Sequence, residues 1–85
     1  MKSRYKIVQT PRFERNFRKL SSESRRRVAE KILLLETDPA AGKPLHGELK
    51  GLSSLRVGSY RVVYEIQHER IILHMVGHRR AAYRN

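Results

Sequence analysis

Apolar residues recur at helical intervals in the first half of the chain and in short strand-like runs in the second half. We expect the first helix to begin after Thr10, with Pro11 at its first position. The second should follow Ser21-Ser22 and end before Asp38-Pro39. Two stripes spaced by three or four residues predict these amphipathic helices: Phe13, Phe17 and Leu20, then Val28, Ile32 and Leu35.

Residues suited to β-strands flank this helical region. One run covers residues 5–9, and three more follow a glycine- and proline-containing loop, at 54–57, 60–66 and 70–76. The connections between the last three runs are short, which predicts consecutive antiparallel pairing. The predicted order is β-α-α-β-β-β. It defines an α+β fold with two N-terminal helices packed on one face of a small, mainly antiparallel sheet.

The length of 85 residues predicts a single domain, residues 1–85, and the absence of cysteine means that packing alone must stabilise it. No apolar run approaches the roughly 20 residues that a membrane-spanning helix needs, and no signal peptide is recognisable. We therefore expect a cytoplasmic protein. The formal net charge of +11, from 19 Lys+Arg and 8 Asp+Glu, predicts a polyanionic partner.

Acidic residues and histidines give little support for metal or cofactor chemistry. The eight acids are scattered, and the four histidines lack the spacing of metal ligands. Hydrolysis by two metal ions or by paired carboxylates needs converging acids, so we expect no metal and no cofactor. His68 fits a turn, and His74 fits a hydrogen-bonded histidine within the last strand.

The basic residues form two groups. Those on the predicted helices serve either as a solvated surface or as sequence-independent phosphate contacts. They are Arg12, Arg15, Arg18, Lys19, Arg25, Arg26, Arg27 and Lys31. The second group lies on or beside the predicted strands and in the C-terminal tail, and consists of Lys50, Arg56, Arg61, Arg79 and Arg80.

Arg56 and Arg61 flank the predicted Gly58-Ser59 turn, so they should be near neighbours on adjacent strands, where like charges repel. Arg61 lies in a mostly apolar strand, and a buried guanidinium without a partner is costly. Either Glu48 or Glu65 neutralises it, or an external anion does. From the pattern alone the internal ion pair is slightly favoured.

Tyr83 follows Arg79 by four residues and would share one side of a helical turn with it. The simplest interpretation is an apolar anchor for the tail. Alternatively, the surrounding cations would stabilise a phenolate and so favour proton transfer, or the ring would stack on an unpaired RNA base.

Three segments together resemble the RelE/ParE superfamily of toxins. They are G-x-L-K-G-L at 47–52, S-L-R-V-G-S-Y-R-V-V-Y-E-I at 54–66 and V-G-H-R-R-x-x-Y-R at 76–84. The resemblance extends to chain length and element order, and implies a compact microbial RNase-like fold. It also implies the toxin of a type II toxin–antitoxin pair.

Within this superfamily the RelE branch cleaves messenger RNA in the ribosomal A site, and the ParE branch inhibits DNA gyrase. Arg61, Arg79 and Tyr83 match the catalytic arginines and C-terminal tyrosine of the RelE branch. The resemblance therefore favours a ribosome-dependent endoribonuclease. Arg56 matches a position that is often lysine, and Ser54 falls where some members have a second lysine. These departures leave the proton donor open.

The mechanism implied by the resemblance is a metal-free attack of a ribose 2′-OH on the adjacent phosphate, with Arg61, Arg79, Tyr83 and Arg56 as catalytic residues. The expected partners are the ribosome with its 16S RNA, messenger RNA and an acidic RelB-like antitoxin. A gyrase inhibitor without nuclease activity and a non-catalytic RNA-binding module remain alternatives. The expected RNA-binding residues are Lys50, His78, Arg80, Arg84, Arg25, Arg26 and Arg27.

Overall fold

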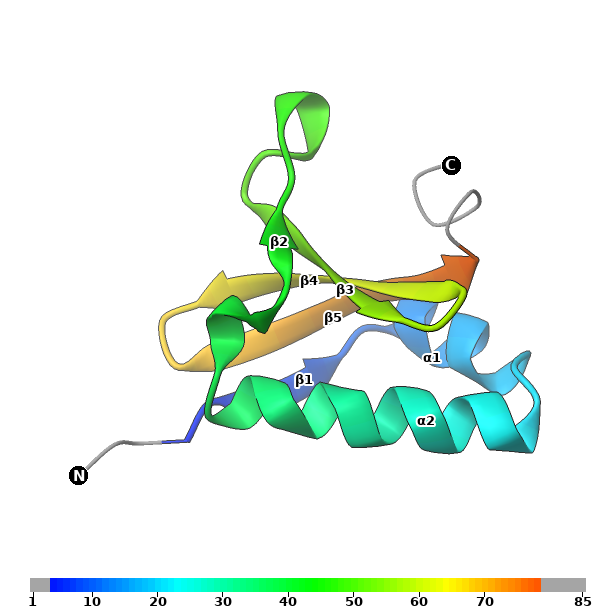
Figure 1. Ribbon diagram of the computed structural model, residues 1–85. Helices are drawn as coiled ribbons and strands as arrows, with labels where there is room; N and C mark the ends of the chain where they lie inside the picture. The colour runs from blue at the N-terminus through cyan, green and yellow to red at the C-terminus, as the bar shows by residue number, and fades with distance from the viewer. Residues whose placement is uncertain (1–3, 79–85) are drawn as a thin grey trace.

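The computed structural model describes residues 4–78, which form two helices and a five-stranded mixed sheet (Figure 1). The strand order is β1-β5-β4-β3-β2, with β1 parallel to β5 and the other neighbours antiparallel. The predicted α+β fold is confirmed. The elements are β1 (Lys6–Gln9), α1 (Pro11–Arg18), α2 (Ser22–Leu33), β2 (Lys43–Pro44), β3 (Leu52–Val57), β4 (Tyr60–Gln67) and β5 (Arg70–His78).

The structure differs from the sequence-based prediction at several element ends. The two-residue strand β2 lies in the expected loop and pairs with Ser53 and Ser54 at the sheet edge. Proline is tolerated there because an edge strand leaves one side unpaired. Strand β5 continues to His78, since Gly77 and His78 still pair with β4. Helix α2 ends at Leu33 and is followed by a 3₁₀ turn, Leu34–Glu36.

Helix α1 begins where β1 leaves the sheet, and polar side chains join it to β5. The Thr10 hydroxyl accepts a hydrogen bond from the Phe13 backbone N–H (3.2 Å) and donates one to the carbonyl of Leu73 (2.8 Å). Farther along, the Val76 N–H donates to Asn16 Oδ1 (3.3 Å). Helix α1 thus supplies hydrogen-bond partners to the edge of β5 beyond the end of β1.

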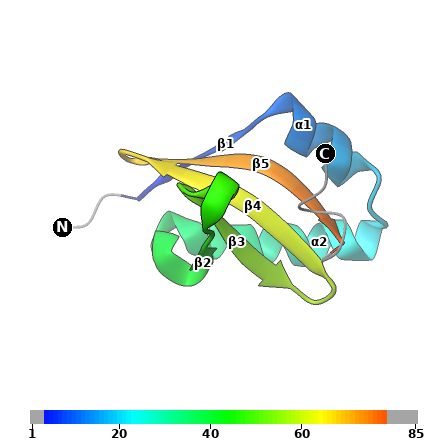
Figure 2. The same ribbon diagram turned by 90° about the horizontal axis from the view of Figure 1, so that it is seen from above.

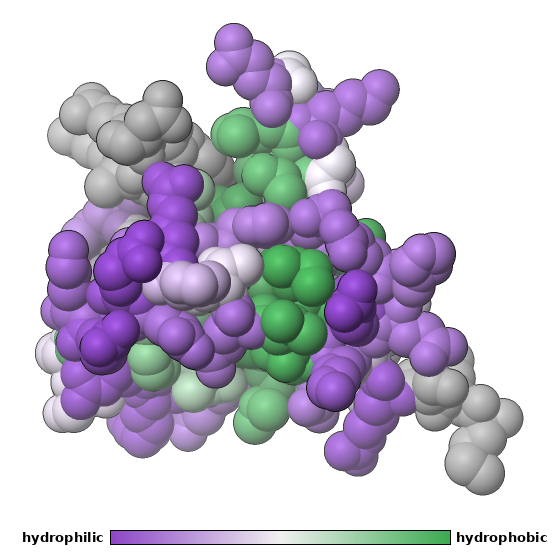
Figure 3. Space-filling model, turned by 180° about the vertical axis from the view of Figure 1, so that it is seen from behind, coloured by the Kyte–Doolittle hydropathy of each residue, from purple (hydrophilic) through white to green (hydrophobic). Residues whose placement is uncertain are grey.

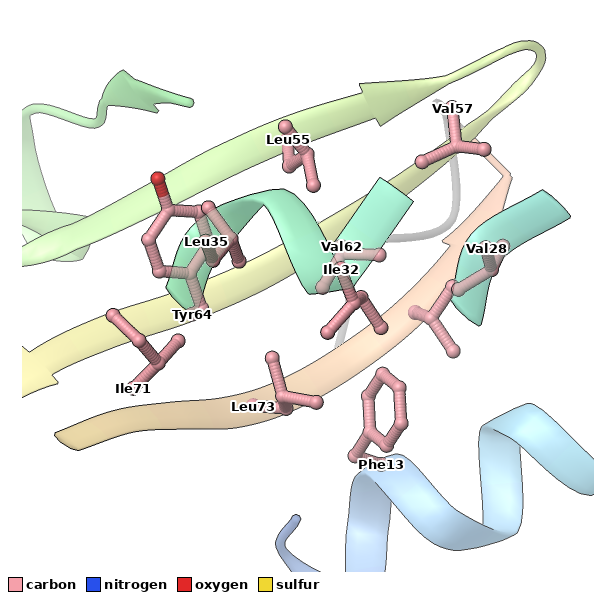
Figure 4. Close-up of a cluster of buried hydrophobic side chains, with 11 residues drawn as sticks. Phe13, Val28, Ile32, Leu35, Leu55, Val57, Val62, Tyr64, Ile71 and Leu73 are labelled. Atoms are coloured by element: carbon pink, nitrogen blue, oxygen red, sulfur yellow. The ribbon is translucent and has the colours of Figure 1, made fainter. Parts of the chain in front are cut away.

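The core lies between the two helices and one face of the sheet (Figure 4). Phe13 of α1 and Val28 of α2 are almost fully buried, as is Tyr64 of β4. These side chains meet because alternate strand residues point to the same face, and helix residues three or four apart share a stripe. The remaining core members are Ile32, Leu35, Leu55, Val57, Val62, Ile71, Leu73 and Val76.

Viewed from above, α2 runs beneath the sheet and α1 lies on the β1/β5 side, away from β3 (Figure 2). On the β3 side of the sheet, Arg27 and Lys31 of α2 lie beside the end of β3.

Hydrophilic side chains cover most of the rear surface, around an apolar area (Figure 3). Within residues 4–78 no helix combines the length and apolar character needed to cross a membrane.

Candidate functional site

Arg56 of β3 and Arg61 of β4 occupy opposite positions of the antiparallel ladder, as the sequence predicts. Residues opposite each other in such a ladder point to the same face of the sheet. Ser54 shares this face because it lies two residues before Arg56. The Arg61 guanidinium donates from Nη1 to Ser54 Oγ over 3.4 Å. Arg56 is exposed and Arg61 is half-buried, so both cations can meet a ligand from solvent.

A cavity of about 360 Å³ opens beside these arginines, where the short strand β2 leaves part of the β3 edge uncovered. Cations from four elements line it, namely Lys31 of α2, Lys43 of β2, Arg56 and Arg61. Lys43 pairs in register with Ser54, which explains how a residue from the loop region reaches this site. The rest of the lining is Ala41, Ser54 and Leu55.

A second cavity of about 290 Å³ lies between α2 and the end of β3. Lys31 and Arg56 line both cavities, so the two are adjacent. Arg27 adds a further cation beside the β3–β4 turn, where a Cβ at Gly58 would lie 3.4 Å from its Nη2. We call the joined surface the basic groove and define it by Arg27, Lys31, Lys43, Arg56 and Arg61.

Tyr64 holds the segment that delivers Lys43 to the basic groove. Its buried hydroxyl donates to the Pro39 carbonyl (2.7 Å) and accepts from the Gly42 N–H (3.0 Å). Burial raises the pKa of Tyr64 above its ordinary value and so favours the protonated hydroxyl that donates to Pro39. The two bonds hold the first residue of the 3₁₀ turn Pro39–Ala41 and the residue that follows it, just before β2.

Glu65 is one of the two acids predicted to pair with Arg61, and that prediction is wrong for this residue. Its Oε1 lies 2.9 Å from His74 Nε2 on β5, and its other oxygen accepts from Gln67 (2.9 Å). The hydrogen bond from Gln67, followed by that from His74, lowers the pKa of Glu65. His74 is thus the hydrogen-bonded sheet histidine that its position predicts.

The expected RNA-binding residues on α2 do not lie on one face of the helix. Arg25 donates to the carbonyl of Leu20 (2.7 Å) and so connects α2 to the end of α1. Arg26 is exposed and pairs with Glu30 at 3.4 Å. Only Arg27 lines the basic groove. Consecutive helix residues are about 100° apart, so three in a row cannot share one face.

Two other expected RNA-binding residues lie outside the basic groove. Lys50 is exposed between a 3₁₀ turn, Gly47–Leu49, and the start of β3. His78 ends β5, pairs in register with Tyr60, and its ring lies 4.7 Å from the Tyr60 ring. Arg79, Arg80, Tyr83 and Arg84 lie outside the described residues. Gly77, near the end of β5, pairs in register with Arg61, so the last described strand ends beside the site.

Lys31 and Lys43 line the site. The sequence places Lys31 only among eight helical cations that could contact phosphate, and it does not single out Lys43. The spacing of Arg27 and Lys31 carried a signal, because residues four apart share a helix face. Lys43 carried none, since a strand of two residues that includes proline has no recognisable period. Its place at the site depends on pairing with β3, which only the three-dimensional structure reveals.

The sheet and the basic groove together define a small α+β protein with a site suited to an anionic ligand. Residues 7–83 match the family described as "ParE toxin of type II toxin-antitoxin system, parDE". The chain therefore belongs to the ParE/RelE family of toxins, which confirms the resemblance found in its sequence.

Similar proteins carry the RelE name. Over 53 residues the chain is 45% identical to Toxin RelE of Mycobacterium tuberculosis, a match that covers 60% of this chain and 55% of that protein. The chain thus matches only about half the length of this relative.

Two solved structures have the same fold over nearly their whole length. The toxin–antitoxin complex RelBE2 of M. tuberculosis contains a chain with 32% identity and a TM-score of 0.85, covering 93% of this chain and 95% of the other. A chain of the intact E. coli RelBE complex is 26% identical to this chain, with a TM-score of 0.75. The match covers 87% of this chain and 95% of the other.

Proposed function

We propose that this toxin is a ribosome-dependent endoribonuclease that cuts messenger RNA in the A site and so inhibits translation. The observation that carries the proposal is the pairing of Arg56 and Arg61 on one face of the sheet, beside a cavity lined by further cations. Converging cations suit a phosphodiester whose negative charge increases during reaction. The RelE name of its relatives also supports the nuclease branch.

The proposed chemistry is attack of a ribose 2′-OH on the adjacent phosphate, with departure of the 5′-oxygen of the next nucleotide. Arginine remains protonated and is unsuited to proton abstraction, so we assign Arg61 and Arg79 to the transition-state phosphate. Tyr83 stacks on a base or transfers a proton. Arg56 and Lys50 support the RNA backbone or the leaving group. With a weak base at the site, much of the rate must come from orientation of the RNA on the ribosome.

The proposed protein partner is an acidic RelB-like antitoxin. Two similar structures are toxin–antitoxin complexes, in M. tuberculosis and E. coli. An acidic, partly disordered chain complements the net charge of +11 and would screen the basic residues of the toxin. Addition of this antitoxin should abolish cleavage.

The decisive experiment combines purified toxin with ribosomes translating a defined messenger and maps new RNA ends at the A-site codon. Removing one group that stabilises transition-state charge costs about 10²- to 10³-fold in rate. We expect losses of this order for Arg61→Ala and Arg79→Ala, and a reduced rate for Tyr83→Phe. Arg70→Ala is the matched control, because Arg70 is exposed at the opposite end of β4 and β5 from Arg61.

The outcome in cells provides a second criterion. Induction of the wild-type toxin should arrest growth, and the double variant Arg79→Ala/Tyr83→Phe should not. Full toxicity of a folded double variant would contradict the assignment. Binding to RNA with neither cleavage nor growth arrest would indicate a plain RNA-binding module.

A gyrase inhibitor is the second candidate, because the matching family carries the ParE name. It predicts that purified toxin blocks DNA supercoiling by gyrase and leaves ribosome-bound messenger intact. The two assays therefore separate the candidates on the same protein preparation.

A further inference from the structure

Two neighbouring cavities share Lys31 and Arg56, and only one of them contains Arg61. The other cavity lies farther along β3, toward the β3–β4 turn. If Arg61 contacts the phosphate that is cut, a neighbouring phosphate of the same strand would lie in this second cavity. It has a volume of about 290 Å³, close to that of the first, and is bordered by α2 and the β3–β4 turn. The basic groove thus has room for anionic groups on both sides of Arg56.

The second cavity has a surplus of positive charge. Arg27, Lys31 and Arg56 line it, and Glu30 is the one carboxylate among the described residues of its lining. Glu30 is already paired with Arg26, 3.4 Å away and on an exposed part of α2. Arg27 and Lys31 are four residues apart, where like charges on a helix repel. A bound anion would relieve that repulsion.

A third, smaller hollow of about 80 Å³ continues the groove beyond Arg27. It shares Arg27 and Val57 with the second cavity and is also lined by Tyr60, whose half-buried ring packs against the core and tilts against His78. A row of cations that leads to an aromatic ring is the arrangement by which proteins bind single-stranded nucleic acid. An acidic peptide would use the cations but has no comparable need for the ring.

We propose that the second cavity is a phosphate subsite for single-stranded RNA, in which Lys31 and Arg27 hold the backbone phosphate next to the one contacted by Arg61. This proposal depends on the proposed function in one respect, namely that Arg61 contacts the phosphate that is cut. Its role is positioning: it fixes the register of the strand through the backbone and reads no base. Binding at this subsite requires neither the ribosome nor cleavage.

The test measures binding of a fluorescent 2′-O-methyl RNA octanucleotide, which cannot be cut because its 2′-oxygens are blocked. Fluorescence anisotropy at several salt concentrations gives the affinity and its salt slope. Loss of one phosphate contact to a single strand should reduce the slope by about 0.7. For Lys31→Ala we expect this reduction together with an affinity loss of about fivefold. Lys31→Arg should retain most of both.

Lys6→Ala is the matched control, because Lys6 is exposed on β1 at the other edge of the sheet. Its salt slope should equal that of the wild type or fall by less than that of Lys31→Ala. The subsite is wrong if Lys31→Ala binds the octanucleotide with wild-type affinity and slope. It is also wrong if Lys31→Ala weakens binding of the antitoxin and leaves binding of the octanucleotide unchanged, since the groove would then be a protein-docking surface.

The two proposals fail separately. A toxin that binds the octanucleotide through Lys31 but does not cut messenger on ribosomes would refute the nuclease and keep the subsite. A toxin that cuts messenger, with octanucleotide binding unaffected by Lys31→Ala, would refute the subsite and keep the nuclease.

Discussion

Arg56 and Arg61 are direct partners in the β3–β4 ladder, so two positive charges occupy one cross-strand position on the same face of the sheet. Opposite charges at such a position stabilise a sheet, and like charges destabilise it. The toxin therefore retains a pair that is unfavourable for folding at the place where a phosphate is proposed to bind. Such conflicts between local stability and function are expected at functional sites.

Replacing Arg56 by threonine should separate these two effects. Threonine suits an exposed strand position, and the change removes the repulsion with Arg61. We expect the free energy of unfolding to rise by about 0.2–1 kcal/mol, as measured by urea denaturation at low salt. The gain should shrink as salt screens the repulsion in the wild type. Messenger cleavage should fall in the same variant, and a loss of stability at all salt concentrations would contradict the electrostatic explanation.

Tyr64→Phe tests the hydrogen bonds that position β2. The change leaves the Gly42 N–H and the Pro39 carbonyl without the hydroxyl that bonds both. We expect a loss of about 1–3 kcal/mol in the free energy of unfolding, because unsatisfied buried polar groups are costly. Tyr60→Phe, at a half-buried position of the same strand, should cost clearly less. Equal urea midpoints for the two variants would show that the Tyr64 hydroxyl contributes little.

The raised pKa of Tyr64 also gives a pH dependence. A group whose pKa is higher in the folded state contributes stability below its unfolded value, about 10, and loses it as pH rises through the folded value. Here burial is the main cause of the rise. The alkaline decline in stability should therefore be steeper for the wild type than for Tyr64→Phe.

The sequence predicts most of the architecture because its apolar periods are regular. The stripe of Val28 and Ile32 permits one buried helix face, and the apolar run around Arg61 predicts a largely buried strand. The short Gly58-Ser59 turn places Arg56 opposite Arg61. Lys43 is different, because its position depends on a two-residue strand and on the Tyr64 hydroxyl, both of which form only through tertiary contacts.

The partner of Glu65 could not be predicted from pattern either. A sheet places several polar side chains within reach of one another, and the bulge between Val63 and Tyr64 changes which of them meet. In the structure His74 and Gln67 bond Glu65.

The carboxylate of Glu65 should titrate below its ordinary pKa. The hydrogen bond from Gln67 is the largest cause, so Gln67→Ala should move the pKa back toward the ordinary value. A depressed folded-state pKa contributes stability above the unfolded value, near 4.3, and this stability is lost as pH falls through the folded value. Carbon-detected NMR titration of Glu65 provides the measurement. An unchanged midpoint in Gln67→Ala would assign the depression to His74.

Gly42→Ala should disturb the basic groove without altering any of its charges. A Cβ at Gly42 would lie 2.6 Å from the Tyr64 hydroxyl and 2.8 Å from the Ser54 carbonyl, both closer than packing permits. The chain must shift at the residue before Lys43, so we expect a loss of about 1–3 kcal/mol in the free energy of unfolding. Affinity for the 2′-O-methyl octanucleotide should fall under conditions where the variant is fully folded. Ala40→Ser, an exposed change two residues earlier, is the control and should alter neither quantity. Wild-type stability and affinity in Gly42→Ala would show that the contact between Gly42 and Tyr64 does not position β2.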